Sequence, residues 1–209
     1  MENVLFIGAH PDDVELGCGG TMAKHTARGD KVFVLILSKG EIGNKKLANC
    51  DRTKETIMAL CSIGIKGKDI TILDVPDTCF DENRKRIFAE IEREVLDKKI
   101  DRVYTHTNRE YHQDHITVHE ETLRAARNVR DLLTYESNAH TFSHFSPNFF
   151  IDISDIINKK IELIKKHYSQ KGKKYMEAEN IKSLAKVRGY QSRVGDYAEG
   201  FEIIRMVTR

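Results

Sequence analysis

Two segments that lie far apart in the chain carry the histidines and aspartates most able to do chemistry. Residues 10–13 (HPDD) follow the apolar run 4–9, and residues 112–115 (HQDH) come shortly after the predicted strand 102–106. Neutral imidazole and carboxylate are good zinc ligands, and a catalytic zinc site uses three of them while one position stays open. One histidine and one aspartate from the first segment, with one histidine from the second, would supply this set.

Adjacent aspartates in one turn point in different directions, so one can bind a metal while the other accepts a proton. A metal lowers the pKa of water from 15.7 to about 7, and a positioned base adds about 10²–10⁴-fold in rate. A remaining histidine could donate to a developing oxyanion. Taken singly, the same residues have ordinary alternatives, because aspartates cap helices and histidines often lie exposed at a helix start.

Alternating strands and helices are predicted around these segments. Residues 4–9, 31–38, 70–75 and 102–106 are predicted strands, and residues 15–28, 51–63, 83–98 and 115–130 are predicted helices. This order predicts a single Rossmann-like α/β domain, with a mainly parallel sheet in the order 3-2-1-4 and helices on both faces. The first and fourth strands are then neighbours, and ligands bind where the carboxyl ends of such strands diverge. The two segments are therefore expected to face each other.

The pattern weakens after residue 132. A short strand is predicted at 134–137, an irregular aromatic stretch at 142–150, helices at 152–168 and 175–187, and a last strand at 202–207. We find no internal repeat and no linker, so one domain is expected over residues 1–209. The five lysines within residues 165–174 are interpreted as a solvated helix end and loop, with a collar for an anionic substrate as the alternative.

Composition limits the classes of partner and compartment. The 209 residues carry 34 basic and 32 acidic side chains, a net charge of +2, which gives little reason to expect nucleic acid. The longest apolar run, 32–37, is far too short for a membrane span, and no secretory signal is visible. The cysteines form no CxxC pair and predict reduced thiols in a cytoplasmic protein; they are Cys18, Cys50, Cys61 and Cys79.

Other binding and catalytic motifs fail. Gly17, Gly19 and Gly20 lie inside the predicted helix, Met22 stands where a dinucleotide fingerprint needs its third glycine, and Ser38 replaces the acidic residue at the second strand end. No phosphate-binding GxxxxGK[ST] and no GxSxG sequence is present.

Among the other histidines, His119 follows His115 by one turn and is expected to support the site or lie on the surface rather than bind metal. His106 borders the crevice without an assigned role; a structural role is expected for His25, His140, His144 and His167.

The two segments also resemble motifs of a known family. Residues 9–21 (AHPDDVELGCGGT) are similar to the opening motif of the PIG-L/LmbE-like zinc deacetylases, and residues 112–115 to their HPDH motif, with Gln113 in place of proline. Weaker similarities cover Arg52 with Glu55, the PD at 76–77, and residues 145–154 and 197–201. The resemblance therefore extends over nearly the whole chain.

This resemblance implies a role for each residue at a matching position. His10, Asp13 and His115 resemble the metal ligands, and Asp12 resembles the general base. His112 resembles the group that stabilises the oxyanion and can protonate the leaving amine, and Asp114 resembles a carboxylate that tunes its neighbouring histidine. Arg52 resembles a substrate-binding arginine, with an ion pair on its own helix face as the alternative.

The predicted function is a hydrolase that uses Zn²⁺, or another divalent metal, to remove the N-acetyl group from an N-acetylglucosamine-type conjugate. The expected partner is a small amino-sugar substrate, and a homo-oligomer is left open because relatives are often oligomeric. Two alternatives remain: a non-catalytic sugar- or nucleotide-binding module of the same fold, and a metal hydrolase of another amide or an ester. The loops after Ser38 and around 142–150 are expected to select the rest of the substrate, with 38–49 as a lid.

Overall fold

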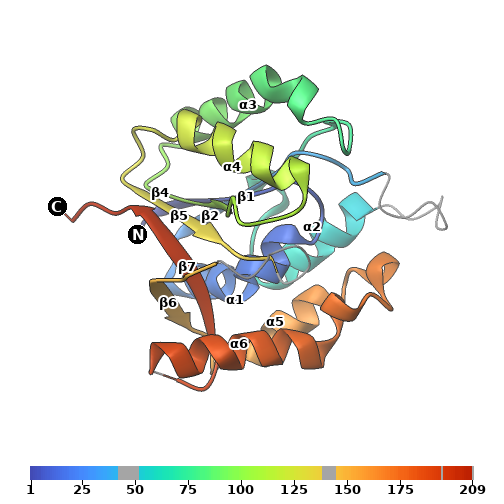
Figure 1. Ribbon diagram of the computed structural model, residues 1–209, viewed down its shortest axis with the longest axis vertical. Helices are drawn as coiled ribbons and strands as arrows, with labels where there is room; N and C mark the ends of the chain where they lie inside the picture. The colour runs from blue at the N-terminus through green and yellow to red at the C-terminus, as the bar shows by residue number, and fades with distance from the viewer. Residues whose placement is uncertain (42–51, 138–144, 194, 209) are drawn as a thin grey trace.

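A seven-stranded sheet forms the centre of the chain in the computed structural model, which describes residues 1–41, 52–137, 145–193 and 195–208 (Figure 1). Its strand order is β3-β2-β1-β4-β5-β7-β6. The first five strands are parallel, whereas β7 runs antiparallel to both β5 and β6. The predicted order 3-2-1-4 is confirmed. The strands are β1 (Asn3–Gly8), β2 (Lys31–Ile36), β3 (Ile70–Ile72), β4 (Arg102–His106), β5 (Asp131–Tyr135), β6 (Phe149–Asp152) and β7 (Ala198–Arg205).

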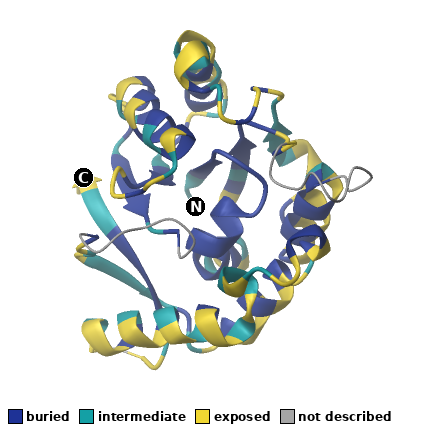
Figure 2. Cartoon of the chain, turned by 45° about the vertical axis from the view of Figure 1, so that its right-hand side comes forward, coloured by how far each residue is buried: buried dark blue, intermediate teal, exposed yellow. Residues whose placement is uncertain are grey.

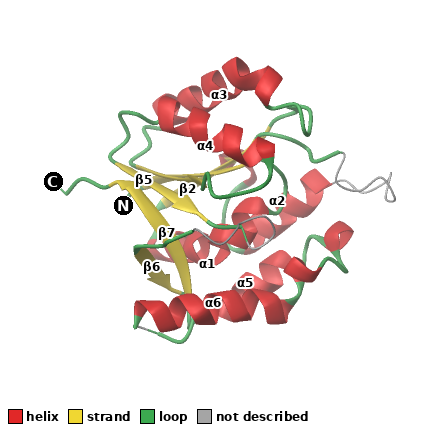
Figure 3. Cartoon of the chain, in the orientation of Figure 1, coloured by secondary structure: helices red, strands yellow, loops and turns green. Residues whose placement is uncertain are grey.

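Helices cover both faces of the sheet, as predicted. Two helices, α3 (Arg84–Asp97) and α4 (Gln113–Ala125), lie on one face (Figures 1 and 3). On the other face lie α1 (Asp13–Arg28), α2 (Arg52–Ser62), α5 (Ile157–Ile164) and α6 (Ala178–Ser192). Short 3-10 turns occupy Gly67–Asp69, Asp81–Asn83, Tyr168–Gln170 and Lys174–Met176.

The alternation of side chains along the strands builds a separate core on each face. In β1, Val4 and Phe6 join the core under α1 and α2, while Leu5 and Ile7 join the core under α3 and α4. All four side chains are fully buried. Strands buried on both faces read as continuous apolar runs, which is why residues 4–9 and 31–38 were identifiable. Figure 2 shows the same layering, with exposed residues mainly on the outward faces of the helices.

The glycines of the first helix serve close packing. A Cβ atom at Gly17 would overlap the ring of Tyr135, and one at Gly20 would lie 2.6 Å from Cγ2 of Ile153. Such overlaps would force α1 away from the sheet, with a cost typical of overpacking, about 1–3 kcal/mol. Glycines within residues 17–20 therefore let α1 approach β5 and the chain beyond β6, which agrees with the absence of a dinucleotide fingerprint.

The sequence-based boundaries in the last third of the chain need correction. Strand β5 begins at Asp131 rather than at residue 134, and β6 lies within and beyond the stretch expected to be irregular. The helix expected at 152–168 is reduced to α5, and Asp152, its expected first residue, instead pairs with β7 as the last residue of β6. This antiparallel pairing joins segments about fifty residues apart, so no local pattern signals it. The predicted last strand is also longer and begins at Ala198.

Three cysteines, Cys18, Cys61 and Cys79, are free thiols, while Cys50 and residues 42–49 of the expected lid lie outside the described residues. Within the described ranges, no helix is both long and apolar enough to span a membrane.

Candidate metal centre and active site

The turn after β1 separates the two adjacent aspartates. Asp12 has a φ of 92°, in the left-handed region that costs a residue other than glycine about 1–3 kcal/mol. This backbone directs the two carboxylates to different sides. Asp13 Oδ2 accepts a hydrogen bond from the backbone N–H of His10 (2.7 Å), whereas Asp12 Oδ2 lies 3.2 Å from Nη2 of Arg52. The expected divergence of the pair is present.

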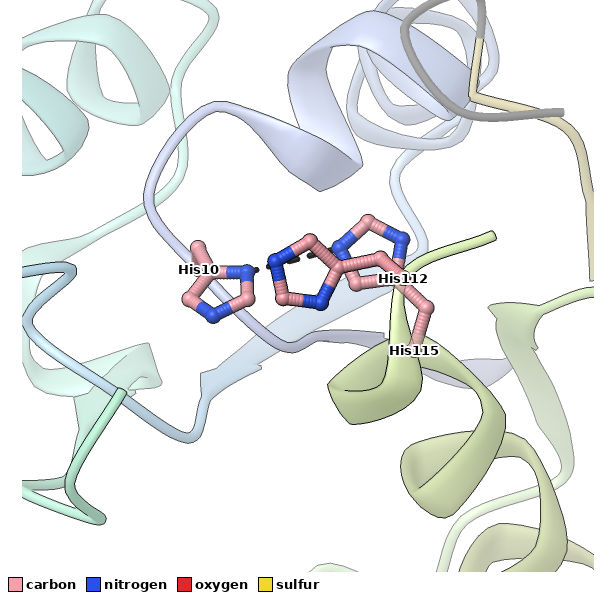
Figure 4. A group of neighbouring side chains, drawn as sticks. All are labelled: His10, His112 and His115. Atoms are coloured by element: carbon pink, nitrogen blue, oxygen red, sulfur yellow. Dashed lines mark hydrogen bonds between the residues drawn. The ribbon is translucent and has the colours of Figure 1, made fainter. Parts of the chain in front are cut away.

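The loop after β4 and the start of α4 bring the second segment to the same point. His10 Nδ1 lies 3.4 Å from His115 Nε2 and 3.6 Å from Asp13 Oδ2, and the Asp13–His115 distance is 3.3 Å. His112 caps α4: its Nδ1 accepts from the backbone N–H of Asp114. Figure 4 shows the three imidazoles of His10, His112 and His115 gathered beside the turn. Residues 105 positions apart meet here because β1 and β4 are paired.

Carboxylates decide which ring nitrogens carry protons. His10 Nε2 lies 3.1 Å from Asp114 Oδ2 and 3.1 Å from Asp77 Oδ1, so in the neutral ring the proton sits on Nε2. His115 Nδ1 contacts Oε2 of Glu110 and likewise carries its proton there. Lone pairs are therefore left on His10 Nδ1 and His115 Nε2. Both point toward Asp13 Oδ2.

Three acceptors that converge in this way repel each other unless a cation lies between them. Zinc–ligand bonds of about 2.0–2.1 Å imply tetrahedral ligand–ligand distances of about 3.3–3.4 Å, close to the spacings found here. The donor set, two imidazoles and one carboxylate, thus fits zinc. Three further sets in the same cluster also have ligand spacing. They are His10 with His112 and His115, Asp13 with His106 and His115, and His10 with Asp77, His112 and Asp114.

The electrostatics of the side chains also favour positive charge at this point. Burial lowers the pKa of His115, but Asp13 and Glu110 outweigh it and raise the pKa to about 9. Burial likewise opposes the charge of His10, yet its carboxylate neighbours, Asp114 first, raise that pKa well above its usual value. A site that raises histidine pKa values stabilises a cation, whether a proton or a metal ion.

Asp12 in the turn after β1 and His112 at the cap of α4 have pKa values that are shifted in directions that suit catalysis. Burial raises the pKa of Asp12 to about 6, with Arg52 lowering it and Asp13 adding to the rise. Asp12 is therefore mainly ionised at neutral pH and more basic than an ordinary carboxylate. Burial and the nearby His115 and His10 lower the pKa of His112 to about 4, so this imidazole is neutral at pH 7.

Arg52, predicted to bind substrate, is buried against the turn. Its guanidinium donates to the carbonyl oxygens of Pro11 (2.6 Å) and Gly40 (3.1 Å) as well as to Asp12. Glu55, considered as its helix-face partner, instead accepts from the backbone and hydroxyl of Ser169. Arg52 thus holds the carboxylate and backbone of the turn in place.

Sequence reasoning did not identify every residue of the cluster. Asp114 was expected to tune a neighbouring histidine, and the structure places its Oδ2 against His10, 104 positions away. Glu110 was missed, although a carboxylate five residues before His115 in a strand-end loop was a visible signal. His106, at the end of β4, lies 3.3 Å from Asp13 Oδ2. His119 stays outside the cluster, where its Nδ1 donates to the carbonyl of His106.

Comparison with known proteins supports the resemblance. The family model "PIG-L: GlcNAc-PI de-N-acetylase" matches residues 5–126. The chain is 30% identical over 174 residues to the uncharacterized deacetylase YaiS of Escherichia coli K12, covering 80% of this chain and 91% of YaiS. It is 29% identical over 192 residues to the diacetylchitobiose deacetylase of Thermococcus kodakarensis, covering 81% and 70% of the two chains.

A solved structure, the conserved protein TT1542 from Thermus thermophilus, superposes with a TM-score of 0.83 at 27% identity, covering 100% of this chain and 97% of that one. The family match spans more than half of the chain, and the match to YaiS spans most of both proteins. The chain therefore belongs to the PIG-L family of de-N-acetylases, which are hydrolases of amide bonds.

Proposed function

We propose that this protein is a zinc-dependent deacetylase that removes the N-acetyl group from an N-acetylglucosamine-type sugar conjugate. The observation that carries the proposal is the convergence of three lone pairs, on His10, Asp13 and His115, at spacings of 3.3–3.6 Å beside the carboxylate of Asp12. These three residues would hold the metal. When bound, zinc supplies a Lewis acid that lowers the pKa of water and polarises a carbonyl.

Asp12 is the proposed general base. Its carboxylate borders the cluster without belonging to the ligand set, and burial raises its pKa to about 6. It would accept a proton from the attacking water and later pass that proton to the departing amine. Arg52, 3.2 Å away, keeps Asp12 oriented and mainly ionised.

His112 is the proposed donor to the developing oxyanion. Because its Nδ1 accepts from the N–H of Asp114, the neutral ring carries its proton on Nε2. The pKa of about 4 keeps the ring neutral at pH 7, so it stabilises the oxyanion by a hydrogen bond rather than as a cation. A single donor of this kind contributes about 2.7–4 kcal/mol to the transition state.

The substrate class is proposed from the relatives. The family model is described as a GlcNAc-PI de-N-acetylase, and the relative from Thermococcus kodakarensis is a diacetylchitobiose deacetylase. Both names refer to 2-acetamido sugars. A small amino-sugar conjugate is therefore the proposed substrate here, and the group attached to the sugar stays open. The expected homo-oligomer and the cytoplasmic location stay predictions.

The test is acetate release by the zinc-reconstituted protein from N-acetylglucosamine, diacetylchitobiose and N-acetylglucosaminyl-inositol. We expect acetate and free amine to appear in a 1:1 ratio, and the metal-free protein to be inactive. If one zinc per chain binds but none of these sugars is deacetylated or bound, the proposed substrate class is wrong. Sugar binding without turnover would favour a binding module, and acetate release from an O-acetylated sugar but from none of these N-acetyl sugars would favour hydrolysis of an ester.

A further inference from the structure

One buried carboxylate outside both sequence motifs contacts two histidines of the cluster. Glu110 lies in the loop between β4 and α4, with only 2% of its surface exposed. Its Oε2 contacts Nδ1 of His115, and its Oε1 lies 3.6 Å from Nδ1 of His106. The two rings stack on each other, with centroids 3.9 Å apart. One carboxylate thus faces the same edge of two stacked imidazoles.

Contacts at the far side of His106 do not by themselves fix its tautomer. The backbone N–H of Ala9 donates to Nε2 over 3.1 Å, whereas Asp13 Oδ2 at 3.3 Å and the Tyr135 hydroxyl oxygen at 3.1 Å can accept a proton from the same nitrogen. The carboxylate of Glu110 beside Nδ1 therefore decides the tautomer and places the proton on Nδ1. Within the described ranges, His106 Nδ1 and Glu110 Oε1 are both buried, neither has a partner within hydrogen-bond distance, and they lie 3.6 Å apart. They face each other, so the N–H of His106 points at Glu110.

The two imidazoles connect Glu110 to both strands that build the site. Through His115 it aims the Nε2 lone pair of a proposed ligand at Asp13. Through His106 it holds the backbone N–H of Ala9, the residue immediately before the second proposed ligand, His10. A carboxylate that accepts from Nδ1 fixes the tautomer and orientation of a metal-ligating imidazole. Glu110 orients the proposed ligand His115 directly. Through His106 it also helps to hold the backbone that carries the proposed ligand His10.

We propose that Glu110 is a positioning residue of the metal centre, which sets the ring orientation and tautomer of His115 and His106 together. The proposal rests on the metal centre of the proposed function. It assigns Glu110 no contact with substrate. Its prediction is therefore a change in metal affinity that does not depend on turnover.

The decisive experiment measures zinc affinity by competition with a chromophoric chelator, for the wild type, Glu110→Gln and a matched control. The glutamine is isosteric and accepts from only one imidazole, so we expect a 10–100-fold weaker affinity, as for other residues that orient ligands. The control is Glu121→Gln. Glu121 is fully buried on helix α4, but its oxygens lie 2.6 Å from Arg84 and Arg124. We expect its zinc affinity to equal that of the wild type.

A second readout follows the ring of His106, which is not a proposed ligand. In the zinc-loaded wild type, nitrogen NMR should show the proton of His106 on Nδ1. In Glu110→Gln the side-chain amide can donate to Nδ1, and we expect the proton to move to Nε2. A purely structural role would leave this tautomer unchanged.

Three results would overturn the proposal: wild-type zinc affinity in Glu110→Gln, an equal loss of affinity in Glu121→Gln, or an unchanged His106 tautomer. If Glu110→Gln fails to fold, Glu110→Asp replaces it. The aspartate keeps the charge but is one methylene shorter, so it should also bind zinc more weakly, and wild-type affinity in that variant would be equally decisive. Failure of the wild type itself to bind zinc would instead contradict the proposed function.

Discussion

The two ends of the parallel strands each hold a cluster of histidine and carboxylates, but only one resembles a metal centre electrostatically. At the amino end, ligand atoms of Glu2, His25 and Asp30 lie within 4.8 Å of one another. His25 Nδ1 is 2.8 Å from Asp30 Oδ2. By residue type and distance, this cluster matches the one at the carboxyl end.

The two clusters differ in whether arginines pair with their carboxylates. At the amino end, Arg28 Nη2 lies 2.5 Å from Asp30 Oδ2 and 3.0 Å from His25 Nδ1, and Arg130 pairs with Glu2. Burial, together with Arg28, lowers the pKa of His25. At the carboxyl end, the carboxylates of Asp13 and Glu110 contact histidines instead, and the pKa of His115 rises to about 9. Counter-charge, more than spacing, therefore distinguishes a site for a cation from a structural ion-pair network.

The largest expected effect concerns Asp12, which lies beside the ligand set. Asp12→Asn removes the proposed base but no ligand, so kcat should fall by about 10²–10⁴-fold while zinc content stays at one per chain. Steady-state kinetics and elemental analysis of the same preparation measure both. Loss of zinc in proportion to activity would mean that the roles of Asp12 and Asp13 are exchanged.

Removing one histidine from the cluster at each end of the parallel strands tests whether only the carboxyl-end cluster binds zinc. His115→Ala should weaken zinc binding by at least about 100-fold, because losing a ligand should cost more than losing a residue that orients one. His25→Ala should leave zinc affinity unchanged. Chelator competition on both variants measures this. Unchanged affinity in His115→Ala would shift the ligand role to another histidine, with His112 and His106 the first to examine.

The ion-pair network at the amino end predicts a stability effect that depends on pH. Hydrogen bonds to His25, the backbone of Glu2 and Arg28 outweigh burial and lower the pKa of Asp30 from 3.8 to about 2. The stabilisation is therefore fully present above pH 4 and is lost as pH falls through about 2. Asp30→Asn should lower the free energy of unfolding by about 2 kcal/mol at pH 7, with a difference that shrinks below pH 4.

Urea unfolding of the wild type and Asp30→Asn at pH 7, 5 and 3 measures that difference, with zinc affinity as the control at pH 7. The affinity should be the same in both proteins. A difference in stability that does not change with pH would show that the carboxylate charge of Asp30 contributes nothing.

The smallest effect expected is on the pKa of His25. Arg28→Ala removes a cation that lowers this pKa, so the pKa should rise. A histidine-ring NMR titration follows it. A constant or falling pKa would mean that burial alone sets it and that the counter-charge does not explain the difference between the two ends.

Much of the fold could be predicted because the buried parallel strands are continuous apolar runs. Residues 4–9 and 31–38 are fully apolar or nearly so, and their alternation with helical segments leads to the order 3-2-1-4 and to facing HPDD and HQDH segments. The last third was less predictable. Strand β6 pairs with β7 some fifty residues later in the chain, and its four residues are only half-buried. The sequence therefore showed neither a long apolar run nor a periodic pattern at this strand.

The sequence by itself determined the residue types of the candidate site and the strand ends that carry them, since local patterns encode both. Only the tertiary structure decided which carboxylate meets which histidine. Asp114, which follows β4, contacts His10, which follows the neighbouring strand β1, and Glu110 contacts His115 and His106 together. Tautomers, pKa values and counter-charges depend on distances of about 3–4 Å, and chain folding alone sets such distances between residues a hundred positions apart.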